Sequence, residues 1–328
     1  MKKYLLAGFI STLLTIVLGF LIIPVLKRLK ANQNILGYVK EHKEKSGTPT
    51  MGGVFFMLAI SITFFIFRRG FSLISIMILT ISLGFFVIGF LDDFIKIKFK
   101  RNLGLTALQK TLFMVVVSII ASLFSYRQGL DFIFLPIVNQ TVNLGVLSIF
   151  LNRIVFIATV NGANLTDGLD GLCASVSIII FISFSVIIGI ETTTYNNMYL
   201  SKEEYENVIL LSVIFAGALI GYLAFNVNKA SVFMGDTGSL AIGGAISSIA
   251  IFSGNTLYIP LVCITFVISA LSVIIQVIYF KKTKKRVFKM SPFHHHLQLI
   301  GKTEWQISYI YTLITLLISV LLIIFIMR

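Results

Sequence analysis

The stretch Asn164-Leu165-Thr166-Asp167-Gly168-Leu169-Asp170-Gly171-Leu172 lies between two long apolar runs of the chain. If it forms a helical turn, the polar side chains of Asn164, Asp167 and Asp170 recur every third residue and share one face. The three leucines lie on the other face. Ionisable groups at the edge of a hydrocarbon layer are costly and are usually functional. We therefore expect this stretch to connect two membrane helices and to line a site.

The composition of the whole chain is that of a membrane protein. Of its 328 residues, 57% are hydrophobic and only 12% are charged, and the mean hydropathy is +0.97. Soluble domains carry about twice that share of charge. We expect one all-α integral membrane domain over residues 1–328. Its ten transmembrane helices are expected near 4–26, 52–67, 71–91, 109–125, 147–160, 172–190, 207–225, 239–253, 257–279 and 306–327, each long enough, or nearly, to cross about 30 Å of hydrocarbon.

The basic residues predict the orientation of these helices. Ten spans place both termini on one side of the membrane, and 19 of the 27 Lys and Arg residues lie in the alternate set of loops. Because cytoplasmic loops are enriched in Lys and Arg, we expect extracytoplasmic termini and five cytoplasmic loops that form the active site. The net charge of +14 then indicates contact with anionic membrane lipid rather than nucleic acid. On the other side, the alternation over Asp131–Gly145 predicts a small periplasmic β-hairpin.

Each of the five expected cytoplasmic loops carries a polar cluster. The first includes Lys45 and Thr50 before Gly52-Gly53, where free amides at a helix start could hold an anion. The alternative is an ordinary capped helix start. The second is Asp92-Asp93, followed by Lys96 and Lys110, which could hold a metal and phosphate. The alternative here is a solvated helix end paired with Lys96.

The stretch at 164–172 is the third cluster, and two more follow it. The fourth contains Asn226, Phe233 and Asp236, where Asp236 either caps a helix or holds Mg²⁺ against a phosphate. Phe233 could be a core residue or could stack on a base. The fifth is Pro292-Phe293-His294-His295-His296, after the basic run Lys281–Lys289. The amide of Gln276 could also line the site.

The residue types of these clusters predict a particular chemistry. Carboxylates favour Mg²⁺ or Mn²⁺, whereas lysines, histidines and helix starts favour phosphate. A site at the membrane edge suggests that one phosphate belongs to a lipid, and an aromatic ring near the metal suggests a nucleotide. We therefore expect Mg²⁺-dependent phosphoryl transfer between a nucleotide and a membrane lipid.

Together the five motifs resemble the polyprenyl-phosphate N-acetylhexosamine-1-phosphate transferases over essentially the whole chain. The motif Pro292-Phe293-His294-His295-His296 resembles the histidine motif of the branch that uses UDP-N-acetylmuramoyl-pentapeptide. The resemblance implies undecaprenyl phosphate as the acceptor, lipid I and UMP as products, and Mg²⁺ as the cofactor, with Mn²⁺ as a substitute. It further implies a role in peptidoglycan synthesis, a homodimer in the bacterial inner membrane, and inhibition by nucleoside antibiotics.

The resemblance also implies roles for individual residues. Asp236 would hold the metal, Asp92 would deprotonate the lipid phosphate, and Asp93 would support the acceptor and metal. A two-step alternative makes one of these last two a covalent nucleophile. Phe233 would stack on uracil, and His294 and His295 would contact donor phosphates or sugar. The uridine pocket and its polar shell would consist of Gly168, Leu169, Asp170, Asn164, Asp167, Lys45, Thr50, Asn226 and Gln276. One departure is Leu297-Gln298, where the family usually has an aromatic residue and Glu.

Two alternative functions remain open from the sequence. A sister enzyme would move N-acetylglucosamine-1-phosphate by the same chemistry. A cation-coupled transporter would instead place polar groups throughout the membrane depth and on both sides. The apolar runs here are nearly free of charge, with Arg153 as the exception.

Overall fold

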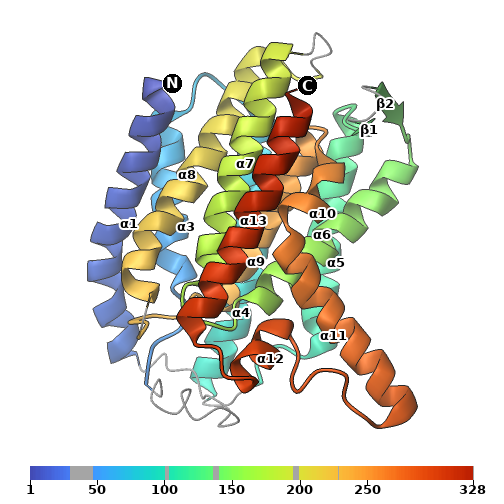
Figure 1. Ribbon diagram of the computed structural model, residues 1–328. Coiled ribbons are helices and arrows are strands. Elements are labelled where there is room, and N and C mark those ends of the chain that lie inside the picture. Colours follow the sequence, from blue (N-terminus) through green and yellow to red (C-terminus); the bar gives the residue numbers. More distant parts are fainter. Residues whose placement is uncertain (30–46, 100–102, 136–139, 195–198, 228, 328) are drawn as a thin grey trace.

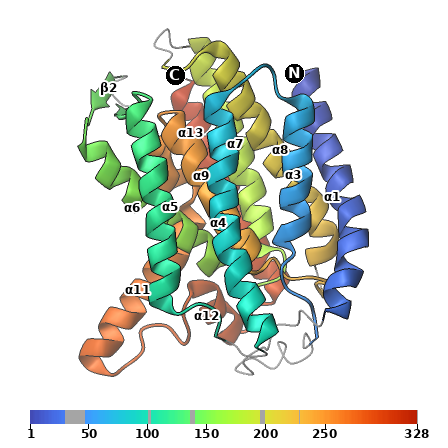
Figure 2. The ribbon, with the colours of Figure 1, turned by 180° about the vertical axis from the view of Figure 1, so that it is seen from behind.

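The computed structural model describes residues 1–29, 47–99, 103–135, 140–194, 199–227 and 229–327. Over these ranges the chain forms an all-α bundle with one small hairpin (Figures 1 and 2). Nine described helices are long and apolar enough to cross a membrane: α1 (Lys2–Arg28), α4 (Leu73–Lys98), α5 (Ala107–Arg127), α6 (Leu147–Thr166), α7 (Leu172–Thr194), α8 (Lys202–Asn226), α9 (Gly235–Phe252), α11 (Ile264–Thr283) and α13 (Glu304–Ile326).

The second of the ten expected spans is a shorter helix. It is α3 (Gly53–Phe67), an apolar helix of 15 residues that packs against α1 and α8. The labelled ends N and C lie together at one end of the bundle, and α12 (Phe293–Leu299) lies at the other (Figure 1).

The ninth expected span is interrupted near Pro260. A 3₁₀ turn, η1 (Thr256–Tyr258), leads into the short α10 (Ile259–Val262), and the chain breaks at Cys263 before α11 begins. Proline is tolerated at a helix start, because the amide hydrogen that it lacks would have no partner within the helix there. From this break α11 diverges from the bundle, and the chain then returns to α12 beneath it (Figure 1).

The predicted hairpin is confirmed. Strands β1 (Phe132–Leu135) and β2 (Gln140–Asn143) pair antiparallel, with Phe132 opposite Asn143. The hairpin lies at the same end of the bundle as the termini (Figure 1).

One prediction about the central stretch is wrong. Asn164 lies in the last turn of α6, which ends at Thr166, and residues 167–171 form turns rather than helix. Gly171 adopts a φ of 71°, a conformation that glycine reaches without steric cost. Asn164, Asp167 and Asp170 therefore do not share a helical face, and their side chains have different partners.

Helix α9 is at the centre of the bundle, because 89% of its most apolar stretch is buried. It packs most extensively on α4 and α6. A Cβ atom at Gly89 of α4 would overlap the carbonyl group of Asp236 at the start of α9. This absence of a side chain lets the two backbones approach closely. The carboxylates in the last turns of α4 and in the first turn of α9 thereby lie close together.

Candidate active site

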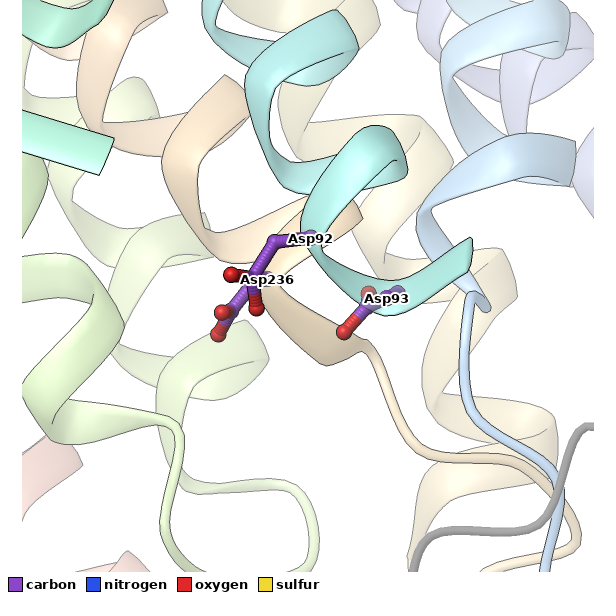
Figure 3. Close-up of side chains that lie close together, drawn as sticks. All are labelled: Asp92, Asp93 and Asp236. Carbon is purple, nitrogen blue, oxygen red and sulfur yellow. The ribbon is translucent and has the colours of Figure 1, made fainter. Parts of the chain in front are cut away.

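Three carboxylates cluster where α4 meets α9 (Figure 3). Asp92 and Asp93 lie in the last turns of α4, Asp236 lies in the first turn of α9, and ligand oxygens of all three lie within 4.8 Å of one another. Asp92 is 3% exposed and Asp93 is 2% exposed. Converging carboxylate oxygens are the donor set that divalent cations such as Mg²⁺ prefer. The cluster therefore fits the metal that the sequence predicts.

Two lysines neutralise part of this negative charge. Lys96 Nζ lies 2.6 Å from Oδ2 of Asp92 and 3.1 Å from Oδ2 of Asp236. Lys110 Nζ, from the start of α5, lies 2.9 Å from the same Asp236 oxygen. Three carboxylates against two ammonium groups leave one net negative charge. A divalent cation would make the cluster net positive, which suits a diphosphate ligand.

Asp93 connects α4 to the amino terminus of α9. Its Oδ2 accepts a hydrogen bond from the Thr237 amide at 3.0 Å and another from Thr237 Oγ1 at 2.7 Å. The amides of a first helical turn have no partner within their own helix, so this carboxylate satisfies one of them. The sequence carries no signal for Thr237, because a threonine after an Asp at a helix start forms no distinctive pattern.

Asn164 brings α6 into the same cluster. Its Nδ2 donates to Asp236 Oδ1 at 2.7 Å and to Ser239 Oγ at 2.9 Å. Its Oδ1 accepts from Lys110 Nζ at 3.4 Å. The amide of Asn164 therefore fixes the Asp236 oxygen opposite the one that the lysines contact.

Asp167 lies just beyond the end of α6. Burial raises the pKa of the Asp167 carboxyl well above its usual range, and the nearby carboxylates of Asp236 and Asp93 raise it further. Burial is thus the main reason for the raised pKa of Asp167, and the neighbouring carboxylates add to it.

The turn after Asp167 is joined to the segment before α9. Asp170 Oδ2 accepts from the Ala230 amide at 3.1 Å, and the Gly171 amide donates to Asn226 Oδ1 at 2.9 Å. Asn226 Nδ2 in turn donates to the Val232 carbonyl at 2.9 Å. Leu169 is buried. Asn226 therefore links the turn at 167–171 to the segment before α9 by hydrogen bonds.

Phe233 is held between the same segment and the start of α3. Its amide donates to the Pro49 carbonyl at 2.8 Å, and its carbonyl accepts from the Gly52 amide at 2.9 Å. Its ring is half-buried, whereas Thr50 is buried beside Gly235. Lys45, the remaining predicted residue of the first cluster, lies outside the described residues.

Two histidines of α12 pack against the turn at Gly168. His294 is fully buried, and a Cβ atom at Gly168 would overlap its Nε2 and lie 3.1 Å from Nε2 of His295. His295 Nδ1 pairs with Gln298 Oε1 at 2.8 Å. The histidine cluster at 292–296 therefore packs against the stretch 164–172 at Gly168.

Gln276 forms three hydrogen bonds to the segment that follows α11. Its Oε1 accepts from the amides of Val287 and Phe288 at 3.0 and 2.9 Å, and its Nε2 donates to the Phe288 carbonyl at 3.0 Å. It thereby fixes the basic segment after α11. A pocket of about 700 Å³ beside it is bordered by Lys281, Lys284, Arg286 and Lys289.

Comparisons with known proteins show the family of this chain. The family model described as glycosyl transferase family 4 matches residues 74–254, and phospho-N-acetylmuramoyl-pentapeptide-transferase signature 1 matches residues 45–57. The chain is 42% identical to the phospho-N-acetylmuramoyl-pentapeptide-transferase of Clostridium botulinum (strain Eklund 17B / Type B), over 97% of this chain and 94% of that protein. It is 41% identical to the enzyme of that name from Bacillus subtilis (strain 168), over 94% of this chain and 96% of the relative. For the Geobacillus sp. (strain WCH70) enzyme of the same name, the identity is 40%, over 96% and 95% of the two chains.

Proposed function

Because the chain belongs to the phospho-N-acetylmuramoyl-pentapeptide-transferases of glycosyl transferase family 4, we propose that it makes lipid I for peptidoglycan synthesis. It transfers phospho-N-acetylmuramoyl-pentapeptide from UDP-N-acetylmuramoyl-pentapeptide to undecaprenyl phosphate and releases UMP. The observation that carries this proposal is the convergence of Asp92, Asp93 and Asp236 with two lysines at one end of the bundle.

The cofactor in this proposal is Mg²⁺, and Mn²⁺ is a substitute. Asp236 would hold the ion, and the neighbouring carboxylate of Asp93 would support it. When bound, the ion would neutralise charge on the diphosphate of the donor. The support is the set of hard oxygen ligands within 4.8 Å of one another.

The transfer itself needs one proton acceptor and fixed positive charge. Asp92 takes the proton of the lipid phosphate, whose oxygen then forms a bond to the β-phosphorus of the donor. The bond from that phosphorus to the bridging oxygen breaks, and UMP leaves. Lys96 and Lys110 stabilise the negative charge that moves between these oxygens.

A covalent aspartyl intermediate would form on Asp92 or Asp93, and we prefer the one-step route because the contacts of Asp93 oppose attack by that residue. One oxygen of that carboxylate already accepts two hydrogen bonds from Thr237, and Lys96 Nζ lies 3.5 Å from the other. A nucleophilic oxygen would have to give up such partners to attack phosphorus. Asp93 instead supports the acceptor and metal by fixing α4 against α9.

Donor recognition is assigned to the loops around Gly168. Uracil stacks on Phe233, and uridine lies against Gly168, Leu169 and Asp170. His294 and His295 face the donor phosphates or sugar. The remaining polar contacts are assigned to Lys45, Thr50, Asn164, Asp167, Asn226 and Gln276. Nucleoside antibiotics that mimic this donor are the expected inhibitors.

The membrane setting is the bacterial inner membrane, with the carboxylate cluster facing the cytoplasm and both termini outside. The support is the bias of Lys and Arg toward the loops at the cluster end. The basic segment Lys281–Lys289 contacts anionic lipid. The chain acts as one transferase domain and assembles as a homodimer.

A direct test is to incubate the purified protein with radiolabelled UDP-N-acetylmuramoyl-pentapeptide, undecaprenyl phosphate and Mg²⁺, and to chromatograph the lipid phase. Label should move to lipid, and UMP should appear in equal amount. UDP-N-acetylglucosamine in the same assay should give no labelled lipid. The reverse preference would assign the chain to the sister reaction.

A further inference from the structure

The first two turns of α13 contact the turn that contains Asp170. Glu304 Oε2 accepts a hydrogen bond from the Asp170 amide at 3.2 Å, and Ser308 Oγ donates to the Asp170 carbonyl at 3.2 Å. Residues four apart on a helix lie on the same face, so α13 presents an acceptor and a donor together. Both backbone groups of one residue are thereby held by a single helix.

A third contact holds the side chain of the same residue. Asp170 Oδ2 accepts from the Ala230 amide at 3.1 Å, in the segment that leads to Phe233. Residues 167–171 form turns between α6 and α7, Gly171 has a φ of 71°, and the Gly171 carbonyl accepts from the Ser175 amide of α7 at 2.9 Å. The position of this turn therefore depends on contacts from outside it.

The start of α13 is itself well fixed. Thr303 and Gln306 form a reciprocal capping box, in which each side chain bonds the backbone of the other residue. Glu304 is the first residue of the helix, where a carboxylate is stabilised by the helix dipole. The acceptor for the Asp170 amide is thus attached to a defined helix start.

From these contacts we propose that Glu304 and Ser308 are positioning residues for donor binding. They hold the turn Gly168–Asp170 in place against the histidines of α12, so that the nucleotide meets a preformed surface. This inference rests on the proposed function, because it assigns the turn to the UDP-linked donor. Neither residue touches the reacting atoms, so their loss should affect donor binding more than turnover.

The kinetic test compares Glu304→Ala, Glu304→Gln and Ser308→Ala with the parent enzyme. Glu304→Ala should raise the KM for the UDP-linked donor about tenfold, because a hydrogen bond to a charged group is lost. The KM for undecaprenyl phosphate and kcat should stay within about twofold. Glu304→Gln keeps an acceptor oxygen and should recover most of the donor affinity. Ser308→Ala should give a smaller rise.

The matched control is Thr312→Val, one turn further along α13. The Thr312 hydroxyl donates to the Ser308 carbonyl of its own helix, so its removal leaves the Asp170 contacts in place. It should behave as the parent enzyme does. An effect of Thr312→Val equal to that of Ser308→Ala would overturn the proposal.

A second measurement does not depend on catalysis. Hydrogen exchange followed by mass spectrometry should show faster exchange over residues 168–171 in Glu304→Ala and Ser308→Ala, without substrate and with the other helices unchanged. Unaltered exchange over residues 168–171 would overturn the proposed positioning role of Glu304 and Ser308 even if activity fell. If the parent enzyme failed to make lipid I, the proposed function would fail, while the exchange data would still decide whether α13 holds the turn.

Discussion

The side-chain amide of Asn164 donates a 2.7 Å hydrogen bond to Oδ1 of Asp236. The two residues are 72 positions apart and lie on α6 and α9. Since Lys96 and Lys110 contact the other oxygen of Asp236, the carboxylate is restrained on both sides. As the proposed metal ligand, Asp236 would thereby be held in one orientation, which is how outer partners tune a metal site.

Replacing Asn164 should therefore weaken the metal site without removing a ligand. Asn164→Leu is expected to lower activity about 10–100-fold and to raise the Mg²⁺ concentration needed for half-maximal rate. A Mg²⁺ titration of UMP release measures both. The control is Asn161→Leu, which loses a bond to the Ile157 carbonyl of its own helix. Similar Mg²⁺ curves for the two variants would contradict this role.

Loss of the carboxylate at Asp236 should have a more severe effect. Asp236→Asn keeps the shape of the side chain but leaves Lys96 and Lys110 without their shared anion, and UMP release should be abolished. In the parent enzyme, a chelator should stop UMP release and added Mg²⁺ or Mn²⁺ should restore it. Substantial turnover by the variant at saturating Mg²⁺ would rule out Asp236 as the metal ligand.

Thr237 offers a test of the link between α4 and α9. Thr237→Val preserves shape but removes the hydroxyl that donates to Asp93, at a cost of about 1–3 kcal/mol for a buried partner left short of a bond. Both the thermal midpoint in detergent and kcat should fall. Thr237→Ser restores the hydroxyl and should recover both quantities. A serine variant as impaired as the valine variant would show that the methyl group, rather than the hydrogen bond, matters.

Phe233 tests the assignment of the nucleotide site. Its backbone is held through Pro49 and Gly52, so Phe233→Ala should leave the loop in place and remove only the ring. Loss of stacking on uracil should weaken donor binding by about 1–3 kcal/mol, with the acceptor KM unchanged. Separate titrations of the two substrates measure this difference. An unchanged donor KM would exclude stacking.

Gly89 tests the close approach of the two helices that carry the carboxylates. Gly89→Ala would force a methyl group against the Asp236 backbone, so α9 must shift and activity should be lost although no polar group changes. Gly84→Ala on the same helix would meet only the Val117 side chain, at 3.2 Å, and should be tolerated. Equal activity of the two variants would mean that the contact is not needed.

Much of this architecture could be predicted because polar residues are so rare in the chain. The apolar runs located nearly every helix, and carboxylates at their ends indicated where a site had to lie. The ends of α4, α6 and α9 were less well predicted. All three helices extend further than their apolar runs, because Asp92, Asn164 and Asp236 find polar partners inside the bundle.

The turn at 167–171 and the role of Thr237 could not be predicted by the same reasoning. Helical spacing would place Asp167 and Asp170 on one face. Asp170 instead lies in a turn, where it forms hydrogen bonds with Ala230, Glu304 and Ser308. Those partners are distant in sequence, so no local pattern indicates them. Thr237 has a hydrogen bond that depends on α4 lying beside α9, which is a property of the assembled bundle.

The enclosure of α9 has a consequence for the synthesis of the chain. Its mean hydropathy is only 1.2, against 2.7 for α13, and several of its residues are glycine or serine. Such a segment gains little from lipid alone and would partition poorly during insertion. Its main neighbours, α4 and α6, precede it in the chain and are therefore synthesised before it. The order of the helices thus gives this weakly apolar helix a protein surface to enter.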